Sequence, residues 1–82
     1  MIHKMFTVYD SKAEAYLQPF FSSTTGLAIR SFTEAVNQND HQFSKYPEDY
    51  TLFEIGSYND EDGSFDILDA KKSIGLAVDF VN

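Results

Sequence analysis

The chain has 82 residues and a net charge of −7, and 43% of its residues are hydrophobic and 16% aromatic. This length suits one domain over residues 1–82, near the lower limit for a single hydrophobic core, and the aromatic content argues against disorder. The absence of cysteine excludes disulfides and thiolate metal sites. No apolar run approaches the ~20 residues of a membrane span, and no signal-peptide pattern is visible, so we expect an intracellular soluble protein.

Charge is distributed unevenly. Residues 1–38 contain three basic and three acidic groups, residues 39–70 contain one basic and nine acidic groups, and residues 71–82 carry one net positive charge. Nucleic-acid binders usually neutralise phosphates with Lys and Arg. The overall charge therefore argues against strong non-specific DNA binding, although the neutral first half is compatible with a local site.

The first expected element is a strand over residues 2–9, with apolar groups on both sides and a central place in a small sheet. Its apolar side chains alternate, with Ile2, Phe6 and Val8 on one face and Met5 and Tyr9 on the other.

Two helices are expected next. Residues 11–14 match the S-x-x-E capping box, which predicts a short helix through about Leu17, ended by Pro19. Residues 20–26 are expected to form an extended loop. An apolar stripe at spacings of three and four predicts a helix over residues 27–37, and residues 41–49 are expected to be an irregular connection.

A hairpin is predicted from strands over residues 50–58 and 64–68, joined by an acidic turn in which Gly63 suits a positive φ. Strict alternation in the first strand places Phe53 and Ile55 on one face, and the other face receives Tyr50, Leu52 and Tyr58.

The last segment has two interpretations. We favour a helix capped by Asp69, because residues 74, 77, 78 and 81 are apolar at helical spacing. Residues 74, 76, 78 and 80 also alternate, which supports a strand, and Gly75 weakens a helix by up to about 1 kcal/mol. The preferred order, strand-helix-helix-strand-strand-helix, predicts an α+β fold with a small three-stranded, mainly antiparallel sheet and helices packed on one face.

No motif for catalysis is visible, so we expect no catalytic residues and no enzyme. The acidic turn resembles a calcium loop only in part, because Tyr58 stands where the first aspartate is required. We therefore expect no metal and no other cofactor.

Strand tyrosines near basic residues suggest a surface on which bases could stack, as in many single-strand binders. The simpler interpretation is that the aromatic residues form the core of a small domain. The candidate DNA-binding residues are Lys4, Tyr9, Lys12, Arg30, Tyr50 and Tyr58.

Three segments carry a family resemblance: DSKAEAY over residues 10–16, GLAIRSF over residues 26–32 and PEDYTLFEIG over residues 47–56. In order and spacing they resemble the small nonstructural protein of gokushovirus-type microviruses, which are single-stranded DNA phages. The resemblance implies an accessory protein of the host bacterial cytoplasm. It also implies DNA binding at the switch to single-strand synthesis and packaging, and it supplies no catalytic residues.

Two functions follow as hypotheses. The first is contact with single-stranded viral DNA, and the alternative is an acidic regulator that binds a viral or host replication or assembly protein through Asp60, Glu61 and Asp62. We also expect a homodimer, paired through an edge strand or an aromatic face, because a small open sheet leaves unpaired edges. Its acidic hairpin tips should point away from the interface, and no membrane partner is expected.

Overall fold

The computed structural model describes residues 1–82 as five strands, two α-helices and one 3-10 turn. The strands are β1 (Ile2–Asp10), β2 (Ala15–Tyr16), β3 (Phe20–Ser22), β4 (Tyr50–Asn59) and β5 (Ser64–Leu76). The helical segments are α1 (Thr25–Val36), α2 (Gln42–Lys45) and the 3-10 turn η1 (Ala77–Phe80).

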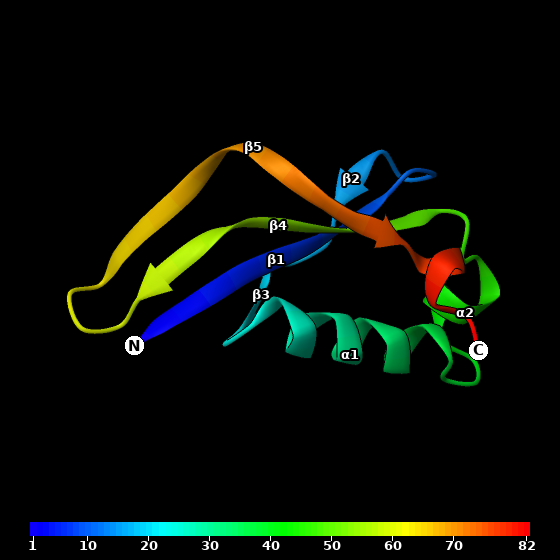
Figure 1. The fold of residues 1–82 in the computed structure, drawn as a ribbon. Coiled ribbons are helices and arrows are strands. Elements are labelled where there is room, and N and C mark those ends of the chain that lie inside the picture. Colours follow the sequence, from blue (N-terminus) through cyan, green and yellow to red (C-terminus); the bar gives the residue numbers. More distant parts are fainter.

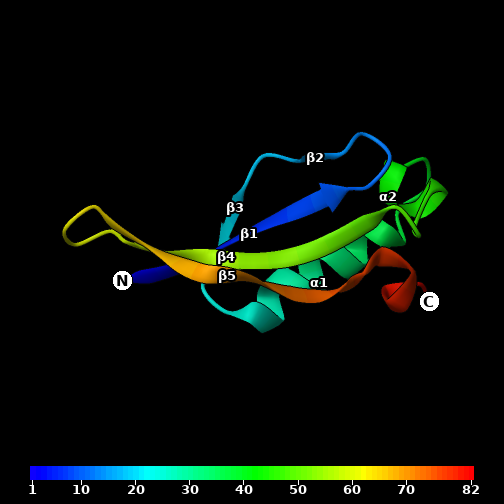
Figure 2. The ribbon, with the colours of Figure 1, turned by 90° about the horizontal axis from the view of Figure 1, so that it is seen from above.

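All five strands belong to one antiparallel sheet (Figures 1 and 2). β1 is central: β4 pairs along one side of it, and β3 and β2 pair with different parts of its other side. β5 pairs only with β4 and forms the outer edge. The strand expected over residues 2–9 and its central position are therefore confirmed.

The core lies between the sheet and α1, which runs along one face of the sheet (Figure 1). The sheet contributes Phe6 and Leu52, both fully buried, and the helix contributes Phe32. α1 begins where the Thr24 hydroxyl accepts a hydrogen bond from the Leu27 amide, an N-cap that satisfies an otherwise unpaired donor. The helix expected over residues 27–37 is confirmed, two residues longer at its start and one shorter at its end.

The β4–β5 hairpin continues past the start of α1 (Figure 1). We call residues 57–66 the arm. Further along, β5 arches away from α1 at residues 68–71 (Figure 1). Between the pairs Gly56–Ile67 and Glu54–Lys72, these four residues of β5 face only Ile55 of β4, so the longer strand bends out. The arm lengthens the molecule, whose radius of gyration is 13.0 Å, against about 12 Å for a spherical domain of this length.

The predicted three-stranded α+β fold is wrong. The protein is mostly β, with a five-stranded antiparallel sheet and only two short α-helices. The two extra strands come from residues 15–22, which lie beside β1. Their segments are too short to show a periodic pattern of their own, so they form because β1 presents unpaired backbone groups next to them.

The helix expected over residues 11–17 is also wrong. The Asp10 carboxylate accepts hydrogen bonds from the Lys12 and Ala13 amides, which turns the chain back on itself. Glu14 has φ of 56°, a left-handed conformation that ends the turn and leads into β2. Local side-chain bonding thus replaces the expected capping box.

The helix expected after Asp69, over residues 70–81, is replaced by the second half of β5 and the four-residue turn η1. Cross-strand pairing of Gly75 with Leu52 decides in favour of the strand. The connection expected to be irregular over residues 41–49 contains the one-turn helix α2, capped by His41 Nδ1. None of the helical segments has the length and apolar composition that a membrane crossing requires.

Candidate nucleic-acid interface

The sheet has one face without a helix. Since successive side chains of a strand point to opposite sides and Phe6 and Val8 face α1, the opposite face of β1 carries His3, Met5, Thr7 and Tyr9. We call this side of the sheet, with the aligned residues of the other strands, the open face. Figure 2 looks onto it, with α1 behind the strands.

Four rings gather on the open face beside the hairpin, and we call them the hairpin cluster: His3, Phe21, Tyr58 and Phe65. Tyr58 is central, with its ring centroid 4.9 Å from that of Phe65 and 6.1 Å from that of Phe21. The cluster lines a recess of about 550 Å³. Phe65 is 59% exposed, so an apolar surface faces solvent here.

A second group, the tyrosine cluster, lies toward the other end of the open face and consists of Tyr9, Tyr16, Phe53 and Lys71. The Tyr16 ring centroid is 4.7 Å from that of Tyr9 and 6.1 Å from that of Phe53. Lys71, on the β5 arch, holds its ammonium 5.3 Å from the Tyr16 centroid, a cation–π distance. Aromatic faces and a positive charge therefore meet at one place.

The two clusters lie along one line of the sheet. His3 and Tyr9 are six residues apart on β1, a separation of about 20 Å at 3.3 Å per residue. Met5 and Thr7 fill the space between them and are buried. The Thr7 hydroxyl donates to the Leu17 carbonyl at 2.8 Å. The two aromatic clusters therefore lie near the two ends of the open face, and the side chains between them on β1 are buried.

A bulge in β4 brings Phe53 and Tyr58 to the same face. Glu54 pairs with Phe6 and Gly56 with Met5, so Ile55 is an extra residue. The prediction that Phe53 and Tyr58 lie on opposite faces assumed that side chains alternate along the whole strand. It is wrong, because the extra residue of a bulge moves the side chains beyond it to the other face.

The acidic hairpin tip is held together by its own carboxylates. Asp60 accepts a hydrogen bond from the Met1 ammonium at 2.7 Å and lies 2.8 Å from His3 Nε2, and these contacts lower the pKa of Asp60 below its usual value. The Ser64 hydroxyl and amide donate to Asp62 and lower the pKa of Asp62. The Glu61 side chain projects into solvent and is 80% exposed.

The residues expected to bind DNA are not all together. Tyr9 and Tyr58 lie on the open face, one in each cluster. Lys4 lies on the α1 side, where its ammonium donates to the Thr25 hydroxyl at 3.1 Å and lies 3.7 Å from the Glu54 carboxylate. Lys12 is exposed in the turn between β1 and β2.

The two other candidates lie away from the open face. Arg30 is on the exposed side of α1. Tyr50 belongs to the core and is 7% exposed. Burial raises the pKa of the Tyr50 hydroxyl, with a further contribution from the charges of Asp10 and Asp49.

Sequence reasoning did not select six members of the two clusters: His3, Tyr16, Phe21, Phe53, Phe65 and Lys71. Phe53 and Phe65 stand in predicted strands, so their type and position gave a usable signal. Tyr16 and Lys71 are 55 positions apart in the chain, and only the arch of β5 brings them together, so no local pattern could have linked them.

Neither histidine stands in a group of metal-binding side chains. His3 contacts Asp60, and His41 accepts a hydrogen bond from the Phe43 amide. No three side chains of the types His, Cys, Asp and Glu lie close enough to hold a metal ion together.

The Phage ORF5 protein family matches residues 3–80 of the chain. The chain therefore belongs to the Phage ORF5 protein family. A relative, Protein ORF5 of Chlamydia phage 1, is 35% identical over 69 residues, which cover 79% of this chain and 72% of the relative. The resemblance to the gokushovirus-type microvirus protein is thus confirmed. No solved structure matches the chain.

Proposed function

We propose that this phage protein is a non-enzymatic accessory protein that binds single-stranded DNA on the open face of its sheet. The observation that carries the proposal is the pair of exposed aromatic clusters on a sheet face that no helix covers. Bases stack on such rings regardless of sequence, and each stacked base contributes about 1–3 kcal/mol. Such binding suits a protein that contacts a whole genome during single-strand synthesis and packaging.

The charge of the protein shapes the expected binding mode. Lys71 lies within the tyrosine cluster, whereas Lys4 is engaged with Glu54 on the other side of the sheet. With one or two phosphate contacts, the salt dependence for a single strand should be shallow, with a slope of about −0.7 per contact. Stacking, rather than phosphate neutralisation, supplies most of the affinity in this proposal.

Fluorescence anisotropy with a labelled oligothymidine, at about 50 and 200 mM salt, tests the proposal. Tyr16→Ala and Phe65→Ala should each weaken binding about 5- to 150-fold, the equivalent of 1–3 kcal/mol. Tyr46→Ala is the matched control, because Tyr46 is similarly exposed, at 55%, and lies in the polar recess with Lys12 and Asp49. Absence of binding at about 100 µM protein and low salt would refute the proposal, since non-specific binders reach that range.

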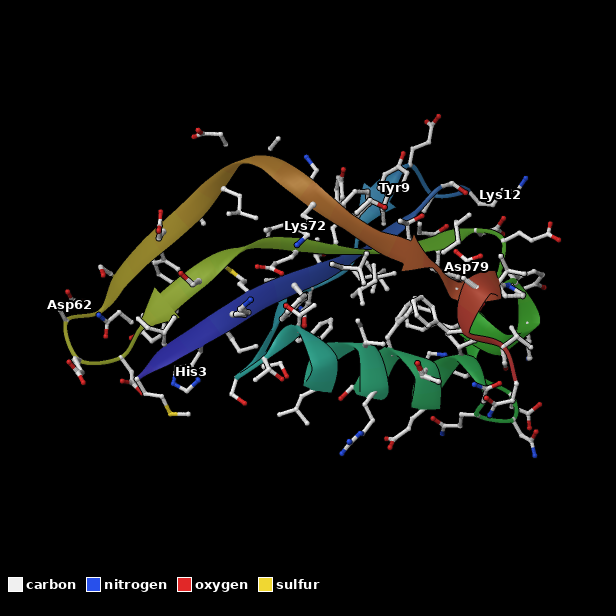
Figure 3. All side chains as sticks on the ribbon, in the orientation of Figure 1. His3, Tyr9, Lys12, Asp62, Lys72 and Asp79 are labelled. Carbon is white, nitrogen blue, oxygen red and sulfur yellow. The ribbon has the colours of Figure 1, made fainter.

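The acidic hairpin supports the alternative, a regulator that binds a basic replication or assembly protein. Its tip projects at the end of the arm (Figure 3), and Glu61 is exposed there. A pull-down from infected cells with the wild type and with the triple variant Asp60→Asn, Glu61→Gln, Asp62→Asn tests it. Equal recovery of partners by both proteins would show that the tip only shapes the turn.

A further inference from the structure

The outer edge of β5 is long and uncovered. The strand has 13 residues, pairs only with β4, and carries exposed side chains at every position from 64 to 73. Phe65 and Ile67 are each 59% exposed. A long edge with free backbone groups and apolar side chains is a template for another strand. The edge has no proline and no covering helix or loop, which are two of the common means of blocking such pairing.

The charges along this edge have both signs. Asp66 and Asp69 precede Lys71 and Lys72. A single-sign edge would repel its own copy, but an edge that changes sign along its length is complementary to a second copy running in the opposite direction. The sequence of β5 thus favours an antiparallel partner with the same sequence.

Symmetry limits the possible registers. A two-fold axis perpendicular to the sheet keeps the faces of both copies on the same sides, and directly opposed residues of antiparallel strands point to the same side. The axis must therefore lie midway between one residue and the same residue of the partner copy. We name each register by that residue. An axis at Asp69 would oppose two Asp69 carboxylates, which is unfavourable. An axis at Ala70 opposes Asp69 and the partner's Lys71 twice, places the small Ala70 at the closest approach, and leaves the β5 arch of both copies bent in the same direction.

We propose that two copies of this chain form a homodimer by antiparallel pairing of β5 over residues 66–74, in which the two Ala70 residues lie opposite each other across the two-fold axis. The two chains then adjoin through the β5 arches, whose residues 68–71 have no partner on β4, and the two open faces lie on the same side of the dimer. The acidic tips with Asp60 and Asp62 lie at opposite ends of the dimer, which limits the repulsion between two chains of charge −7. The pairing is independent of DNA and adds to the function proposed above.

Light scattering coupled to gel filtration, without DNA and from about 10 µM to 1 mM protein, measures the association. We expect a mass approaching twice the chain mass of 9.3 kDa as the concentration rises. A mass of one chain across the whole series overturns the proposal.

Charge reversal tests the register. Asp69→Lys and Lys71→Glu should each raise the dissociation constant about tenfold by opposing like charges twice, and the double variant should restore it. Glu34→Lys and Lys45→Glu change the net charge equally at exposed positions of the helices and should have little effect. Circular dichroism confirms that each variant is folded. A dimer that is insensitive to the single reversals, or is not restored by the double variant, refutes pairing at Ala70.

Discussion

Tyr50 shows how one residue can serve the core while its sequence suggests a surface role. Its ring packs beside Phe43, with centroids 4.6 Å apart, and its side chain also borders the polar recess near Asp10 and Asp49. Burial and these two negative charges disfavour the ionised hydroxyl and raise its pKa above 10.0. Tyr50, which the sequence suggested as a DNA-binding residue, therefore has a structural role.

This raised pKa makes stability depend on alkaline pH. The folded state holds the Tyr50 proton more tightly than the unfolded state, so the contribution is complete below pH 10 and is lost as pH rises through the folded pKa. Tyr50→Phe should lose less stability than the wild type between about pH 8 and pH 11, measured as urea midpoints. Tyr46→Phe, at an exposed position, is the control, and parallel losses in wild type and Tyr50→Phe would contradict the prediction.

Asp60 has the opposite dependence. Hydrogen bonds from the Met1 ammonium and from His3 lower its pKa below 3.8, so its stabilising contribution is present above that value and is lost as pH falls through the folded pKa. Asp60→Asn should lower the melting temperature at about pH 6, and the difference from wild type should shrink toward about pH 2. Glu34→Gln, on the exposed side of α1, should show no such convergence. A difference that is constant with pH would show that the charge of Asp60 has no part in the effect.

At the scale of elements, Gly56 allows β4 and β5 to approach each other. A Cβ at this position would collide with the Asp66 carbonyl oxygen and lie 3.1 Å from the Ile67 Cα, and neither backbone atom can move without disturbing the ladder. Gly56→Ala should destabilise the protein by about 1–3 kcal/mol, as overpacking does.

The matched change is Gly26→Ala in the first turn of α1. A Cβ there meets only the Thr24 hydroxyl, at 3.9 Å, and alanine favours a helix by up to about 1 kcal/mol over glycine. Chemical denaturation of both variants should therefore give changes of opposite sign. Equal stability of Gly56→Ala and wild type would mean that the hairpin shifts freely at the bulge.

The elements that sequence predicts well are those whose pattern is local. β1 and α1 each bury a periodic apolar face, and the hairpin turn contains Gly63 with φ of 74°. The second half of β5 was missed because residues 74–80 fit both periods, and pairing with β4 decided between them. The same reason applies to β2, whose two residues form a strand only because Tyr9 and Asp10 lie beside them.

At the scale of the whole molecule, the candidate site could be predicted only in part. Tyr9 and Tyr58 stand in predicted strands, and both lie on the open face. The grouping of the other members of the two clusters could not be predicted. The bulge at Ile55 brings Phe53 and Tyr58 to the same face, and the β5 arch brings Lys71 to Tyr16. Both features arise from mismatched strand lengths, which a periodic pattern does not encode.

The net charge of −7 gives a last prediction for the whole chain. Attractive pairs are few, namely Lys4 with Glu54, the contacts of Asp60 with His3 and the Met1 ammonium, and the contact of Glu61 with the same ammonium. The molecule measures 40 × 23 × 17 Å. At 0.01 M salt, where the Debye length is about 30 Å, the excess of negative charge therefore acts across most of the molecule, whereas at 0.15 M the length is about 8 Å and this net repulsion is screened. Self-repulsion destabilises the compact state, so added salt should stabilise it.

We expect the melting temperature to rise by roughly 4–8 °C between 0.01 and 0.15 M sodium chloride, the equivalent of about 1 kcal/mol for a domain of this size. Dilute protein, at about 5 µM, keeps self-association from contributing. Glu34→Lys, which reduces the negative charge by two at an exposed position, should reduce the rise. A melting temperature that falls with salt would mean that the few attractive pairs outweigh the repulsion. The acidic segment over residues 39–70 would then be a stabilising part of the fold.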